Sequence, residues 1–156
     1  MKKISLFIFA SLLFTGISFG QDVNDEITLI QAEFGMEKRQ IVDEVMDLPE
    51  SIKSGFWSIY QQYEAERQLL ARERLLVIDE YLNSYESLDN EIANSLATRI
   101  LKNDASLAKL HQKYYKKFKK VTSARDAAKF LQLDDYIHNT IRNALQQELP
   151  FIDEYK

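Results

Sequence analysis

Residues 87–91, SLDNE, separate two long helical patterns. Before this stretch, apolar side chains recur at three- and four-residue steps from Pro49, which we place in the first helical turn, to about Glu86. After it the same spacing begins again, and Asp89 or Asn90 is the type of residue that caps a helix start. Because the connection is short, we expect the two helices to pack antiparallel, as a hairpin with coiled-coil character.

One further helix is predicted on each side of this hairpin. The first runs from about Asp25 to Met46, and the last begins at a capping motif formed by Ser123 and Asp126 and stops at Pro150. The chain of 156 residues has only four glycines and two prolines, which leaves little material for the tight turns of a sheet. We therefore predict an all-α fold of four helices built on a long antiparallel hairpin.

The first twenty residues have the pattern of a secretory signal peptide. Two lysines come near the start, residues 4–17 form an apolar run, and Ser18 and Gly20 offer small side chains at the cleavage position. The run is shorter than the ~20 apolar residues that span a bilayer, so an uncleaved membrane anchor is the weaker alternative. We expect a periplasmic or secreted protein, with residues 21–156 forming a single helical domain.

Charge and cysteine content exclude several classes of protein. Without residues 1–20 the chain keeps all 24 acidic residues but loses two of its 20 basic ones, which argues against general nucleic-acid binding. The absence of cysteine excludes disulfide scaffolds, thiolate metal sites and cysteine nucleophiles. The sequence contains no phosphate-binding loop, zinc-protease motif, serine elbow or dinucleotide fingerprint. We therefore expect no ATP use, no cofactor and no catalysis.

Asp134, Asp135 and His138 are the constellation that could support an enzyme. The three-residue offset from Asp135 to His138 places a carboxylate and an imidazole on one helical face, as in di-iron bundles. Folding the chain back near Thr122 brings the other histidine, His111, opposite a position ~9 Å along the axis from His138, too far for both rings to reach one ion. We expect structural or solvent-facing histidines and no metal site, with a carboxylate–histidine metal enzyme as the remaining alternative.

Aromatic side chains recur along the second predicted helix. A hairpin of two long helices is too thin to bury several aromatic faces in one layer. One interpretation is that the rings seal an ordinary core under the first and last helices, and we expect this for most of them. The other is that some rings line a concave dimer interface or a client surface, since tyrosine suits half-buried surfaces. The candidate partner-binding residues are Phe56, Tyr60, Tyr63, Tyr81 and Tyr85.

Residues 111–120, HQKYYKKFKK, form a basic stretch at the end of the third predicted helix. Cations there are favoured by the helix dipole, so a solvated face with aromatic side chains pointing inward is the simplest interpretation. A second is docking onto an acidic partner, or onto anionic lipid head groups as a peripheral membrane contact. A third is pairing with the acidic first helix, within the fold or across a dimer. The candidate contact residues are Lys113, Lys116, Lys117 and Lys120.

Three helix starts carry a repeated motif: LPESI at residues 48–52, LDNEI at residues 88–92 and VTSA at residues 121–124. Each has an apolar residue followed by a polar or proline cap. With the signal-peptide pattern and the all-helical pattern, this layout resembles the Spy/CpxP-type periplasmic proteins with LTxxQ motifs. Pro49 and Asp89 stand where those motifs have threonine.

The resemblance implies a curved, four-helix, antiparallel homodimer that acts as an ATP-independent chaperone or senses envelope stress. On this basis we expect an exported helical protein-binding module, chaperone-like or stress-sensing. Its partners would be another protein or unfolded clients, and not nucleic acid. The alternative is a regulatory or scaffold protein that binds one specific membrane partner.

Overall fold

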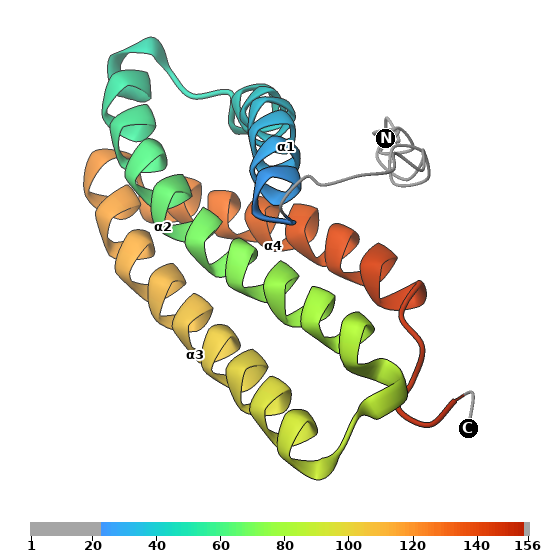
Figure 1. The fold of residues 1–156 in the computed structure, drawn as a ribbon. Coiled ribbons are helices and arrows are strands. Elements are labelled where there is room, and N and C mark those ends of the chain that lie inside the picture. Colours follow the sequence, from blue (N-terminus) through green and yellow to red (C-terminus); the bar gives the residue numbers. More distant parts are fainter. Residues whose placement is uncertain (1–22, 155–156) are drawn as a thin grey trace.

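Within residues 23–154, which the computed structural model describes, the chain forms four α-helices, one short 3₁₀ helix and no strand (Figure 1). The helices are α1 (Val23–Met46), α2 (Glu50–Ser84), α3 (Asn90–Val121) and α4 (Ala124–Gln147), with the 3₁₀ helix η2 (Tyr85–Ser87) after α2. The predicted all-α fold of four helices is confirmed, and the predicted signal peptide lies outside the described residues. None of the described helices combines the length and the apolarity that crossing a bilayer requires.

The last two helices start at the predicted capping residues. The Asp89 side chain accepts a hydrogen bond from the backbone N–H three residues on (2.8 Å), and Ser123 does the same (3.0 Å). Pro49 lies one residue before α2 rather than inside its first turn, since its carbonyl accepts the first hydrogen bonds of that helix. The sequence pattern predicts α-helix to about Glu86, but α2 ends at Ser84 and the chain tightens into η2, a common way for a helix to end.

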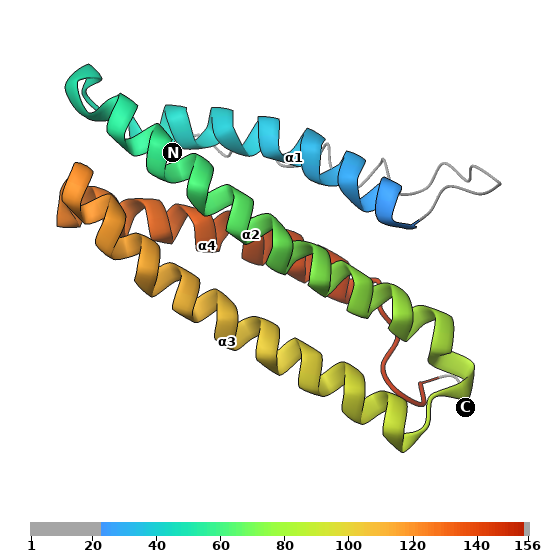
Figure 2. The same cartoon turned by 60° about the vertical axis from the view of Figure 1, so that its left-hand side comes forward.

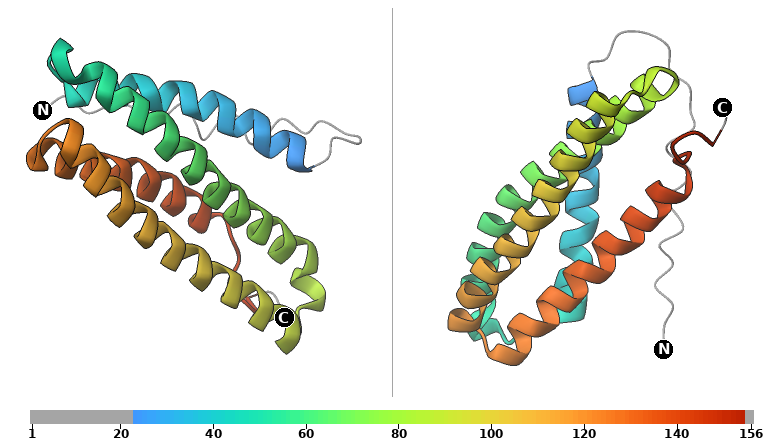
Figure 3. Two further views of the ribbon diagram at one scale, coloured as in Figure 1. Left: turned by 90° about the vertical axis from the view of Figure 1, so that its left-hand side faces the viewer. Right: turned by 90° about the horizontal axis from the view of Figure 1, so that it is seen from below.

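The hairpin of α2 and α3 is covered by the other two helices (Figure 1). α4 packs against α3 near the turn that joins them and diverges from it toward its own C-terminal end (Figure 3). α1 lies over α2 and α4 (Figure 2). Together α1 and α4 supply the second layer that a two-helix hairpin lacks.

The aromatic core lies at the end of the bundle that holds the α1–α2 and α3–α4 turns. The ring centroids of Phe118 and Phe130 are 4.4 Å apart, and Phe56 lies 5.1 Å from Phe118. Phe56, Tyr60 and Tyr63, three of the candidate partner-binding residues, are buried in this core. This corrects their assignment to a partner surface: α1 and α4 cover them, so they pack as the core residues that we expected most rings to be.

Replacing Phe118 with alanine should lower the free energy of unfolding by ~3–5 kcal/mol, because it leaves a cavity among packed rings. The matched control is Leu101→Ala on the same helix, where the side chain is 70% exposed and the loss should stay within ~0.5 kcal/mol. Urea denaturation measures both values. Equal losses in the two variants would contradict the packing described above.

Candidate functional site

Lys38 of α1 is fully buried, with 0% of its side chain exposed. Its ammonium donates to the Glu64 carboxylate of α2, to Asp134 Oδ1 of α4 (2.6 Å) and to His138 Nε2 of α4 (3.0 Å). An ammonium has three N–H donors and no acceptor, so these three groups satisfy it completely. For the same reason His138 Nε2 must be the unprotonated acceptor. Lys38 therefore links α1 to both α2 and α4.

Asp134 lies at the centre of this polar layer and has no exposed surface. Its Oδ2 accepts a hydrogen bond from the Tyr63 hydroxyl of α2 (2.5 Å), and His111 Nε2 of α3 lies 3.4 Å from the same oxygen. His138 Nε2 lies 3.6 Å from Oδ1. One carboxylate thus contacts side chains from all four helices. We call Lys38, Tyr63, Glu64, His111, Asp134 and His138 the Lys38 cluster.

Burial and charge move the pKa values of the Lys38 cluster in different directions. Burial raises the pKa of Asp134, but the Lys38 charge and the His111 hydrogen bond lower it by more, so that it lies well below its usual range. Burial and then the Lys38 charge lower the pKa of His138 to about 2. Burial raises the pKa of Glu64 above its usual value, even though Lys38 acts in the opposite direction. Around neutral pH, Asp134 is therefore ionised and His138 is neutral.

The two histidines, which the sequence places ~9 Å apart along the helix axes, contact different oxygens of Asp134. His111, Asp134 and Asp135 offer ligand atoms within 4.8 Å of one another. Yet His111 turns Nε2 toward Asp134 and Nδ1 toward Asp135 (3.7 Å), and one ion can bind only one of these nitrogens. Lys38 and Tyr63 already donate hydrogen bonds to Asp134, so an ion at this point would compete with them for its carboxylate. The expected absence of a metal stays a prediction.

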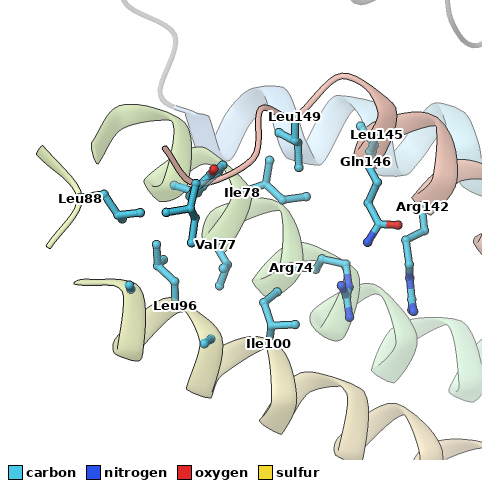
Figure 4. Close-up of a pocket in the computed structure, with 14 residues that line it drawn as sticks. Arg74, Val77, Ile78, Leu88, Leu96, Ile100, Arg142, Leu145, Gln146 and Leu149 are labelled. Atoms are coloured by element: carbon cyan, nitrogen blue, oxygen red, sulfur yellow. The ribbon is translucent and has the colours of Figure 1, made fainter. Parts of the chain in front are cut away.

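A cavity of about 330 Å³ lies between α2, α3 and the C-terminal part of α4 (Figure 4). We call it the apolar pocket, because most of its walls are aliphatic. The main apolar side chains are Val77, Ile78, Leu88, Leu96, Ile100, Leu145, Leu149 and Ile152. Sites for small ligands enclose ~300–1,000 Å³ and have mostly apolar walls. The cavity thus has the size and lining of a ligand site.

Two tyrosines hold the segment after α4 at the outer end of the apolar pocket, near the α2–α3 turn. The Tyr81 hydroxyl donates to the Pro150 carbonyl (2.7 Å), and the Tyr85 hydroxyl donates to the Phe151 carbonyl (2.9 Å). Tyr81 also lines the pocket, as does Ile152 from the bound segment. Both tyrosines are candidates for a partner surface, but the structure uses their hydroxyls to bind the chain itself.

Two arginines lie at the opposite, inner end of the apolar pocket (Figure 4). Arg74 of α2 pairs with Asp104 of α3, and Arg142 of α4 lies 3.9 Å from the same carboxylate oxygen. Burial and the positive charge of Arg142 lower the pKa of Arg74, while Asp104 acts in the opposite direction. This end of the pocket therefore joins three helices through two positive charges and one negative charge.

The basic stretch of α3 packs beside α2. Lys113 donates to the Glu66 carboxylate (2.7 Å) and Lys117 donates to Gln62 (3.0 Å), both on α2. The partner of these two lysines within the fold is therefore α2 and not the acidic first helix. Lys113, Lys116 and Lys120 are exposed, and Lys117 is half-buried. A role of the four lysines in docking to another molecule stays a prediction.

Comparisons with protein-family models, with curated proteins and with solved structures find no match to this chain. The resemblance to Spy/CpxP-type proteins therefore rests on the helix-start motifs, the signal-peptide pattern and the all-helical pattern, and it stays a prediction.

The Lys38 cluster and the apolar pocket are the two features that sequence analysis missed. The cluster could have been found from the sequence, because two charged residues occupy positions of apolar stripes. Lys38 lies four residues after Phe34 and three before Ile41 in α1. Asp134 lies four residues after Phe130 in α4. A charged side chain at such a position is buried only if it is paired. The pocket leaves no comparable signal, because it depends on the angle at which α4 crosses the hairpin.

Replacing Lys38 with methionine should lower the free energy of unfolding by ~3–5 kcal/mol, because Glu64 and Asp134 then stay buried without their cation. The matched control is Lys113→Met: Lys113 is 49% exposed and pairs with Glu66, and such a surface pair contributes ~1 kcal/mol or less. Urea denaturation at neutral pH compares the two. Similar losses would show that the buried cation matters no more than an exposed one.

The free energy of unfolding should fall as the pH decreases from about 6.5 toward about 5, and His138→Gln should reduce this fall. His138 stays neutral in the folded chain, with a pKa of about 2, but takes up a proton near its usual pKa of ~6.5 when unfolded. Because the unfolded state then binds more protons, stability decreases by up to ~1.4 kcal/mol per pH unit for this site.

Glutamine can still accept a hydrogen bond from Lys38, so this variant removes the titrating group and keeps the acceptor. Denaturation curves at several pH values give the two slopes. Identical slopes for the wild type and the variant would contradict a buried, neutral His138.

Proposed function

We propose that this chain is an exported, non-catalytic binding protein that takes an apolar ligand into the pocket between α2, α3 and α4. The observation that carries the proposal is the apolar pocket itself, about 330 Å³ in volume, with aliphatic walls from three helices. Export is proposed from the signal-peptide pattern of residues 1–20. Binding of this kind uses neither ATP nor a catalytic group.

Two sets of polar contacts brace the apolar pocket. Protein interiors normally pack at high density, as the aromatic end of this bundle does. At the inner end of the pocket, the contacts of Arg74 and Arg142 with Asp104 space the three helices. At the outer end, the hydroxyls of Tyr81 and Tyr85 hold the segment after α4. Bracing on both sides supports a built ligand site over a local packing defect.

The apolar pocket also suits a stress-sensing role. A ligand that binds only the folded chain stabilises it, by an amount that grows with ligand concentration. Because the pocket is formed by α2, α3 and α4 together, an occupied pocket favours the arrangement in which these helices are joined. Occupancy would then be the signal that a membrane partner reads, which connects ligand binding to the regulatory alternative.

Chaperone-like binding of unfolded clients is the second candidate. Large apolar side chains are exposed on every helix, namely Met36, Leu69, Leu82, Leu101 and Tyr136. Single exposed apolar residues are common in folded proteins, whereas a client surface needs a continuous patch. We therefore favour the pocket. In an aggregation assay with an unfolded client, suppression that persists after the pocket is blocked would favour the chaperone.

Binding of a neutral apolar fluorophore, such as N-phenylnaphthylamine, tests the proposal on the purified protein. Ala93 lines the pocket, and Ala93→Phe should weaken binding at least about tenfold because the ring occupies the cavity. Ala105→Phe is the matched control, since it adds the same ring to an exposed position of α3 outside the pocket. Thermal unfolding verifies that both variants fold. Wild-type binding by Ala93→Phe, or no saturable binding by the wild type, would overturn the proposal.

A further inference from the structure

We infer that the ligand of the apolar pocket is a single-chain amphiphile with a carboxylate head group, of the medium-chain fatty-acid class. Its head group pairs with Arg74 and Arg142 at the inner end, and its chain lies along the aliphatic walls toward Tyr81. The inference rests on the proposed function, and it names the ligand class for the same site.

The inner end of the apolar pocket carries an excess of positive charge. Within residues 23–154, Arg74 and Arg142 pair with one carboxylate, that of Asp104. Arg67, two turns earlier on α2, lies near enough for its charge to act on Arg74 as well. The Arg74 side chain is only 17% exposed, so water screens its charge poorly. A ligand anion at this point would balance the charge.

The Arg142 guanidinium forms no hydrogen bond with the residues that the structure describes. A guanidinium carries five N–H donors. Asp104 is the acid that pairs with Arg142 within the described part of the chain, and their 3.9 Å separation is too long for a hydrogen bond. Figure 4 shows Arg142 lining the pocket beside Arg74. A carboxylate can accept two parallel hydrogen bonds from a guanidinium, so a carboxylate head group matches these donors.

The volume and the walls of the apolar pocket select the remainder of the ligand. A cavity of about 330 Å³ is near the lower limit of small-ligand sites, which leaves room for one aliphatic chain and not for the two chains of a diacyl lipid. Each methylene group that the walls bury favours binding by the hydrophobic effect. A neutral head group would leave the second positive charge of the two arginines unbalanced, because Asp104 supplies one negative charge, and a cationic head group would be repelled.

Displacement of the neutral fluorophore by three ligands tests the head group. Decanoate, decanol and decyltrimethylammonium carry the same chain with a negative, a neutral and a positive head. We expect decanoate to displace the fluorophore at concentrations at least about tenfold lower than decanol, and the cation to be weakest. High salt should reduce the advantage of decanoate over decanol, because it screens the partly exposed Arg142.

Two variants change the charge at the inner end in opposite directions. Arg142→Gln should weaken decanoate binding at least about tenfold and weaken decanol binding much less. Asp104→Asn removes the competing carboxylate and should strengthen decanoate binding. Arg125→Gln is the matched control, because Arg125 is exposed at the start of α4 and does not line the pocket. Thermal unfolding verifies that each variant folds.

The outcomes separate this inference from the proposed function. If decanol binds as tightly as decanoate, or if Arg142→Gln keeps the preference for decanoate, the carboxylate inference is wrong although the apolar pocket still binds. If no ligand displaces the fluorophore and Ala93→Phe changes nothing, the proposed function is wrong as well.

Discussion

The buried ammonium of Lys38 is the constraint on which the packing of the four helices depends. Transfer of a charge into a protein interior costs several kcal/mol, and here that cost is offset only when Glu64, Asp134 and His138 all lie within hydrogen-bond distance. A shift of α1 by one helical turn, ~5.4 Å, would separate the ammonium from all three acceptors. The Lys38 cluster therefore selects one register of α1 against α2 and α4. Apolar stripes alone would specify this register less strictly.

The Lys38 cluster also divides the bundle into two ends with different packing. On one side aromatic rings fill the core, and on the other side α4 diverges from α3 and the apolar pocket opens (Figures 1 and 3). Successive turns of α4 follow this division. Phe130 packs among the rings, Asp134 belongs to the polar layer, and Arg142 and Leu145 line the pocket. One helix thus contributes to the core, to the register and to the candidate site.

The candidate residues predicted from the sequence lie in different environments within the bundle. Tyr81 lines the apolar pocket, whereas Tyr60 and Tyr63 are covered by α1 and α4. The difference arises because α1 covers the aromatic half of the hairpin, while a cavity remains under the other half. Charged residues within apolar stripes, such as Lys38 and Asp134, are a better guide to special positions than aromatic content. A charge can be buried only beside a partner, whereas an aromatic ring packs against any apolar surface.

The sequence by itself determined the helices of this protein, including their number, their approximate bounds and the caps at Asp89 and Ser123. These features depend on interactions between residues only a few positions apart. Only the tertiary structure decided the acceptors of Lys38 and the shape of the apolar pocket. Lys38 and Asp134 are 96 residues apart in the chain. A periodic pattern indicates that a helical face is buried, but it does not specify which helix lies opposite or at what angle the two cross. The physical reason is that crossing angles result from the combined packing of all four helices and not from any single segment.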